Sequence, residues 1–201
     1  MLGMRHATDS DHIVAVTAIA TRERSVWKAA WLGALWGIGH TLTLLLVGGA
    51  IIAFKLSFTP RLGLSMEFTV AVMLIVLGLL NLFEIGPQRT SVNAARPFAV
   101  GVVHGLAGSA AAALLIVPLI ADPRWAALYL LIFGFGTVVG MTLITVSVAA
   151  PSALMSHRLG GLHRQLRVAS GAVSLLFGIY LAHKIGITDG LFGARPIWTP
   201  R

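Results

Sequence analysis

The sequence predicts an all-α integral membrane protein with about six transmembrane helices, arranged as a 3+3 inverted repeat. The first observation is composition, because 57% of the 201 residues are hydrophobic and only 11% are charged. The second is that apolar segments of about 20 residues, long enough to span a bilayer as a helix, recur along the chain. The third is that short motifs in the first half return in the second at a nearly constant separation.

The apolar segments define the predicted elements in order. The six spans cover residues 2–21, 31–54, 66–83, 98–120, 125–150 and 168–183. Gly86 and Pro87 break the pattern after the third span, and Pro151 is expected to end the fifth. The predicted units are a first three-helix repeat over 1–86, a connector over 87–97, a second repeat over 98–185 and an irregular tail over 186–201. Glu67 and Glu84, near the two ends of the third span, are interpreted as interfacial.

Equivalent residues in the two halves lie 97 to 100 positions apart. The matched pairs are Gly3 and Gly101, His6 and His104, Trp27 and Trp125, Gly37 and Gly134, and Gly78 and Gly178. Because three is an odd number, the second copy must enter the membrane from the side opposite to the first. Secondary transporters have this architecture, and they bind their substrate near the midplane between the two halves.

Two histidines and two aspartates are concentrated in the first span, at His6, Asp9, Asp11 and His12. In a continuous helix with about 100° per residue, His6, Asp9 and His12 share one face and Asp11 points to a different side. Imidazole nitrogen and carboxylate oxygen suit divalent nickel, cobalt or zinc, with Asp11 orienting a ligand. The alternative is a polar helix start, in which an aspartate caps backbone amides. Ionisable residues inside a membrane are functional by default, which favours the metal site.

Histidines in two other predicted spans are further candidate ligands. His40 lies at membrane depth beside glycines that allow another helix to approach closely. His104 opens the corresponding stretch of the second repeat, where small residues replace the aspartates. Ser109 in that stretch is interpreted either as a hydroxyl donor to the site or as a packing residue. His157 and His163 lie in a basic connector and are interpreted as part of a solvated loop.

The cysteine and charge content excludes other classes of site and partner. Without cysteine, the chain has no disulfides and no thiolate metal ligands. Its net charge of +8 comes from 15 basic residues spread over loops and tails, without the basic stripe that nucleic-acid binding needs. Eight basic residues fall in loops on one side and seven on the other. The positive-inside rule therefore favours an external N-terminus in a multi-pass protein of the cytoplasmic (inner) membrane.

The stretch Arg5-His6-Ala7-Thr8-Asp9-Ser10-Asp11-His12-Ile13 closely resembles the signature helix of the nickel/cobalt transporter (NiCoT) superfamily, Arg-His-Ala-x-Asp-Ala-Asp-His-Ile. Gly39-His40-Thr41 is similar to the Gly-His-Ser motif of that superfamily. The stretch 103–109 is more similar to the smaller, urease-accessory (UreH-like) nickel permeases, because the larger transporters have acid-bearing motifs in their second half and eight spans. The resemblance implies metal-ligand roles for His6, Asp9, Asp11, His12 and His40, on a motif helix that begins on the external side.

These observations predict a permease, not an enzyme, that takes up Ni²⁺ or Co²⁺ across the cytoplasmic membrane. His6, Asp9 and His12 are expected to bind the ion, with His40 and His104 completing the shell from facing helices. The ion is the substrate, so no resident cofactor is expected. Besides the ion and the bilayer, candidate partners are a second copy of the chain and the maturation proteins of urease or hydrogenase.

Three other functions compete with uptake. An exporter of the same ions is the first, because this architecture does not fix the direction of transport. A non-transporting accessory protein for metalloenzyme maturation is the second. An intramembrane metalloenzyme is the third, and it is disfavoured because the chain contains no His-Glu-x-x-His helix.

Overall fold

The computed structural model describes residues 2–20, 23, 25–55, 59–83, 94–106, 116–155 and 162–199. These residues form helices joined by turns, and no strand occurs among them, as the predicted all-α class requires. Four of the helices are long and apolar enough to cross a membrane. They are α3 (Val26–Phe54), α4 (Pro60–Leu82), α7 (Pro123–Met155) and α8 (Leu162–His183), which continues into the π-helical turn η2 (Lys184–Thr188).

Local signals start two of the long helices. The Ser25 hydroxyl accepts a hydrogen bond from the backbone N–H of Lys28 at the start of α3, and Thr59 does the same for Leu62 at the start of α4. The expected end of the fifth span at Pro151 is wrong, because α7 runs through this proline to Met155. A proline one turn before a helix end removes a single hydrogen bond near solvent, so the last turn can still form.

The remaining elements are short. They are α1 (Leu2–His6), α2 (Ser10–Ala20), α5 (Ala95–His104) and the 3₁₀ turn η1 (Val117–Leu119). The continuous helix assumed over 2–21 is therefore wrong, since the chain leaves the helix at residues 7–9. Hydroxyl and carboxylate side chains there compete for backbone hydrogen bonds, and the Thr8 hydroxyl donates to the carbonyl of Arg5 at 2.6 Å.

Parts of two other predicted elements lie outside the described residues. The predicted span 98–120 begins as α5, but residues 107–115 in its middle are among those not described. The same holds for residues 84–93, which include Gly86, Pro87 and most of the predicted connector. The count of six spans and the domain boundaries therefore remain predictions.

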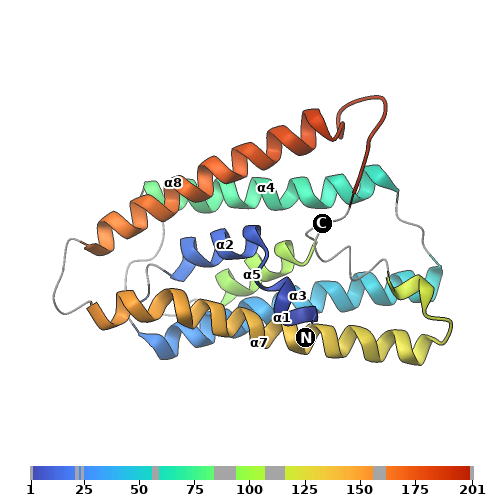
Figure 1. Ribbon diagram of the computed structural model, residues 1–201, viewed down its shortest axis with the longest axis horizontal. Coiled ribbons are helices and arrows are strands. Elements are labelled where there is room, and N and C mark those ends of the chain that lie inside the picture. Colours follow the sequence, from blue (N-terminus) through green and yellow to red (C-terminus); the bar gives the residue numbers. More distant parts are fainter. Residues whose placement is uncertain are drawn as a thin grey trace.

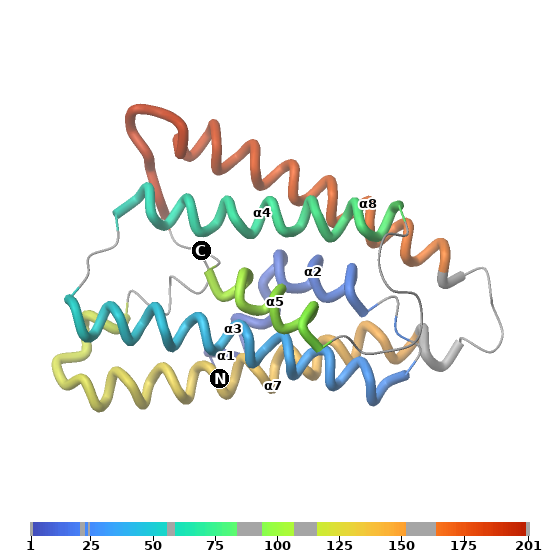
Figure 2. The backbone as a smooth tube through the Cα atoms, turned by 180° about the vertical axis from the view of Figure 1, so that it is seen from behind, coloured from blue at the N-terminus to red at the C-terminus, as the bar shows by residue number. Residues whose placement is uncertain are grey.

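The four long helices form two antiparallel pairs. α3 packs along α7, and α4 packs along α8. Figure 1 shows the α4–α8 pair on one side of the molecule and the α3–α7 pair on the other, with α2 and α5 between them, and Figure 2 shows the same layers from behind. α2 contacts helices of both pairs, and α5 contacts α3 and α4. The two pairs are thus joined largely through the short helices that carry candidate ligands.

Equivalent glycines make equivalent contacts between paired helices. A Cβ atom added to Gly78 would lie 2.6 Å from the backbone nitrogen of Leu175, and one added to Gly178 would lie 2.8 Å from that of Ile75. Gly78 and Gly178 are 100 positions apart, and so are their partners Ile75 and Leu175. The second contact is therefore the counterpart of the first, with the glycine in the second half of the chain and its partner in the first half. The contact of Gly37 with Val138 has its counterpart in that of Gly134 with Thr41. The contact of Gly39 with Val102 has its counterpart in that of Gly136 with Met4.

Asn81, in the last turn of α4, is buried between helices. Its side-chain Nδ2 donates to the carbonyl of Ala18 at 2.6 Å, and the Arg167 guanidinium donates to the Asn81 carbonyl at 2.9 Å. Ala18 lies in the last turn of α2, where carbonyls have no partner within the helix. Asn81 therefore ties α2 to α4, and Arg167 extends the connection to α8.

The segment after Thr188 turns back over the first turns of α4. Trp198 packs against Gly63, and its Nε1 donates to the Glu67 carboxylate at 2.8 Å. Arg61 donates to the carbonyl of Gly193 at 3.2 Å. Residues 189–199 contain no regular helix, but they are anchored to α4 by these contacts.

Candidate metal centre

The turn between α1 and α2 places two carboxylate–histidine pairs side by side. The Asp9 N–H donates to the His6 carbonyl at 3.1 Å, and the Asp9 carbonyl accepts from Ile13 at 3.0 Å, so Asp9 joins the two helices. His6 Nδ1 lies 3.0 Å from Asp9 Oδ2, and His12 Nδ1 lies 3.2 Å from Asp11 Oδ1. A carboxylate that accepts from Nδ1 fixes the tautomer of a neutral imidazole and leaves Nε2 as the metal-binding atom.

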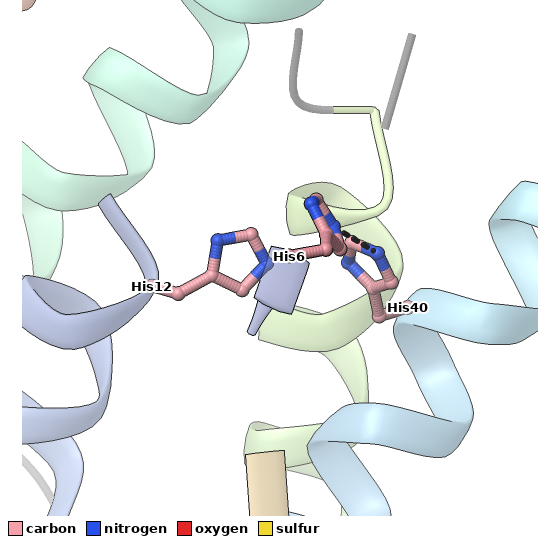
Figure 3. A group of neighbouring side chains, drawn as sticks. All are labelled: His6, His12 and His40. Atoms are coloured by element: carbon pink, nitrogen blue, oxygen red, sulfur yellow. Dashed lines mark hydrogen bonds between the residues drawn. The ribbon is translucent and has the colours of Figure 1, made fainter. Parts of the chain in front are cut away.

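The first group that could hold a metal consists of His6, His12 and His40, from α1, α2 and α3. One nitrogen of each lies within 4.8 Å of the others. His6 Nε2 is 3.1 Å from His40 Nε2, the contact dashed in Figure 3, and the His12 ring lies 4.5 Å from that of His6. All three side chains are buried. Three neutral imidazoles are a donor set that suits nickel, cobalt or zinc.

The second group consists of Asp11, His12 and His104, from α2 and α5. Its ligand atoms also lie within 4.8 Å of one another. His104 Nε2 is 3.1 Å from Asp11 Oδ2, and the rings of His12 and His104 are 4.1 Å apart. His12 belongs to both groups, so the two form one continuous cluster of five side chains.

Several nitrogens of this cluster are buried without a hydrogen-bond partner in the described part of the chain. They are Nε2 of His12, Nδ1 of His40 and Nδ1 of His104. Leaving a buried polar atom unpaired costs about 1–3 kcal/mol each. A metal ion would satisfy such nitrogens, which supports a binding site over a purely structural cluster.

Comparison with known proteins places the chain in a family. No family model and no solved structure matches it. The urease accessory protein UreH of Bacillus sp. (strain TB-90) is 33% identical over 210 aligned positions, which cover 96% of this chain and 92% of that protein. This chain belongs to the UreH-like branch of the NiCoT superfamily. With four helices long and apolar enough to span a bilayer, this UreH-like chain is a multi-pass membrane protein.

A more distant relative of the UreH-like chain is a plant protein. The chloroplast protein FOR GROWTH AND FERTILITY 2 of Arabidopsis thaliana is 26% identical over 194 aligned positions. The match covers 84% of this chain and 50% of the plant protein.

The structure of the UreH-like chain brings together five of the six predicted site residues, but it places the two aspartates differently. Asp11, expected on another side of the helix, lies in the second group with His104. Asp9, expected among the ligands, lies outside both groups, contacts His6 and has a side chain that is 38% exposed. The break at residues 7–9 causes the difference, because it gives α2 another orientation relative to α1 than a single continuous helix would have.

The structure does not describe the side chains of three other positions that the sequence singled out. Ser109 and His157 lie outside the described residues, and the side chain of His163 is not described. Sequence reasoning missed Trp36 and Phe133, whose rings lie 5.3 Å from His104 and 5.4 Å from His6. The signal for Trp36 is its position one helical turn before His40. Trp36 and Phe133 are also 97 positions apart, as equivalent residues of the two halves are.

Proposed function

We propose that this chain is a permease that takes up Ni²⁺ or Co²⁺ across the cytoplasmic membrane. The observation that carries the proposal is the cluster of buried histidines with Asp11, which lies on the short helices between the two long-helix pairs and, through His40, on α3. A site there would be exposed to either side of the membrane if one pair moved relative to the other. The nitrogen and oxygen donors suit these ions, and the resemblance of the opening motif to the nickel/cobalt signature supports the same substrates.

The reciprocal glycine contacts support an inverted repeat. In such a repeat each contact between the halves has a counterpart in which the halves exchange roles, as Gly78 with Leu175 and Gly178 with Ile75 do. Transporters built this way bind their substrate between the repeats, on interrupted helices. The interruption between α1 and α2, with His6 and His12 on either side, fits that arrangement.

Uptake of radioactive nickel by cells that express the chain tests the proposal. We expect saturable uptake that is lost in His12→Ala, because His12 belongs to both groups. The matched control is His183→Ala, which removes an exposed histidine at the end of α8 and should leave uptake unchanged. Unlabelled cobalt or zinc as competitors would rank the ions. Lower accumulation than in empty cells would show export instead, and no change in accumulation would contradict transport.

The name of the Bacillus relative favours a second candidate, an accessory role in urease maturation. Urease activity in cells that express urease with and without this chain separates the two at limiting nickel. A permease is bypassed when excess nickel is supplied, so urease activity should recover without the chain. An assembly protein would still be needed at high nickel, and co-purification with urease or its maturation proteins would support that role.

A further inference from the structure

We propose that the cluster holds the ion at two alternative positions that share His12, and that the ion passes between them without leaving protein ligands. The aspartate position consists of Asp11, His12 and His104, and the histidine position of His6, His12 and His40. This inference rests on the proposed function, because it describes how the cargo moves within the same site.

His12 is the central residue of the cluster, because it belongs to both positions. Its ring lies 4.1 Å from that of His104 and 4.5 Å from that of His6, whereas the rings of His40 and His104 are 6.2 Å apart. His40 and His104 each belong to one position only. An ion that moves from one position to the other can therefore keep its bond to His12 while it exchanges the remaining ligands.

Because both positions share His12, the cluster holds one ion at a time. The Nδ1 of His12 is engaged by Asp11 Oδ1 at 3.2 Å, and its Nε2 is buried without a hydrogen-bond partner among the described residues. A neutral imidazole has one unprotonated nitrogen, so His12 can bind only one metal ion at a time. We expect a stoichiometry of one ion per chain.

The two positions differ in donor chemistry and in access to solvent. The aspartate position includes a carboxylate whose side chain is 18% exposed, whereas the side chains of the histidine position are 6% exposed or less. A charged oxygen donor favours a hydrated divalent cation, and three imidazoles favour a dehydrated one. Conduction of an ion requires sites that are strong enough to bind it and numerous enough to release it, which two overlapping positions provide.

The test uses Co²⁺ with the purified full chain in detergent, because the scattering of imidazole rings in the cobalt X-ray absorption spectrum counts the histidine ligands. His40→Ala removes a ligand of the histidine position only, and His104→Ala removes one of the aspartate position only. His12→Ala removes a ligand of both, and His183→Ala is the control. Each alanine variant is paired with the glutamine variant at the same position, which fills more of the buried volume.

We expect wild type to bind one Co²⁺. His40→Ala should keep one ion with two histidine ligands, and His104→Ala should keep one ion with three. His12→Ala should bind at least about 100-fold more weakly, since even loss of an outer-shell partner costs 10–100-fold. In the uptake assay His40→Ala and His104→Ala should both lose transport, although each still binds an ion.

Identical spectra for His40→Ala and His104→Ala would overturn the proposal, as would loss of binding in either of them to the level of His12→Ala. Two ions bound to wild type, or uptake at the wild-type rate in a variant that lacks one position, would do the same. The binding measurements need no transport. A chain with two distinguishable positions but no nickel flux would refute the permease and leave the two positions standing, whereas flux through a single composite site would refute only the two positions.

Discussion

Asp9 and Asp11 are only two residues apart, but their carboxylates make different contacts. Asp9 contacts only His6 among the cluster residues, and it lies outside both candidate metal groups. Asp11 contacts His12 and His104, which connects α2 to α5. The difference matters for metal binding. A carboxylate that contacts only a histidine, as that of Asp9 does, can orient this ligand, whereas a carboxylate within a candidate group, as that of Asp11 is, can bind the ion itself.

Replacing Asp9 with asparagine should weaken metal binding without destroying the site. The amide keeps the shape but removes the negative charge that holds the His6 tautomer, so we expect Co²⁺ affinity to fall about 10–100-fold. Titration of purified Asp9→Asn with Co²⁺, beside wild type and His183→Ala, measures the change. A loss of Co²⁺ binding as large as that of His12→Ala would show that Asp9 is a ligand and that the assignment is wrong.

Acidification should weaken metal binding at the same cluster. The ion needs neutral imidazoles and an ionised Asp11, and protons compete for these atoms as pH falls. Dissociation constants measured from about pH 7.5 to about pH 4, a range that extends well below the ordinary histidine pKa, should rise as the pH falls. An affinity that stays constant over this range would argue against histidine ligands.

At the scale of elements, glycines set how closely the long helices pack. A Cβ on Gly78 would lie 2.6 Å from a backbone nitrogen of α8, which cannot move without displacing the helix. Gly49 in α3 is the matched contrast, since a Cβ there meets no atom within 4 Å. Gly78 and Gly49 both lie within a helix, and they differ in the atoms that surround them.

Gly78→Ala should therefore destabilise the protein and Gly49→Ala should not. Overpacking costs about 1–3 kcal/mol, whereas alanine at an open helical position stabilises by about 0.5–1 kcal/mol relative to glycine. Thermal unfolding of both variants in the same detergent compares them directly. Equal melting temperatures would show that α4 and α8 separate easily at Gly78.

At the scale of the whole molecule, the two repeats should enter the membrane from opposite sides. Trp27 and Trp125 are equivalent residues, each in the first turn of its long helix, and both are exposed. α3 and α7 are antiparallel, so their first turns lie at opposite ends of the pair. Because the chain contains no cysteine, a single introduced thiol reports one position without background.

Trp27→Cys and Trp125→Cys should react with a membrane-impermeant maleimide from opposite sides. By the charge distribution, Trp125→Cys should be labelled on intact cells and Trp27→Cys only after the membrane is permeabilised. Cells expressing the cysteine-free wild type give the blank. Labelling of both positions from one side would exclude the inverted arrangement.

The class of the protein and the residue types of its candidate site follow from the sequence alone. Apolar segments and few charges predict membrane-spanning helices, and this prediction does not depend on how the helices pack against one another. The motif from His6 to His12 identified the metal-ligand residue types, and the spacing of 97 to 100 residues anticipated which glycines have equivalent partners. These are properties of the chain that can be read without knowing which segments meet.

The break at residues 7–9, the burial of Asn81 and the division of the candidate ligands into two groups that share His12 depend on tertiary packing. Asp11 and His104 are 93 positions apart, and no local pattern predicts that they come within 3.1 Å. Helical periodicity assigns side chains to a face only while the helix is continuous. Once the helix breaks, packing between α2, α5 and the two long-helix pairs decides which groups share a site.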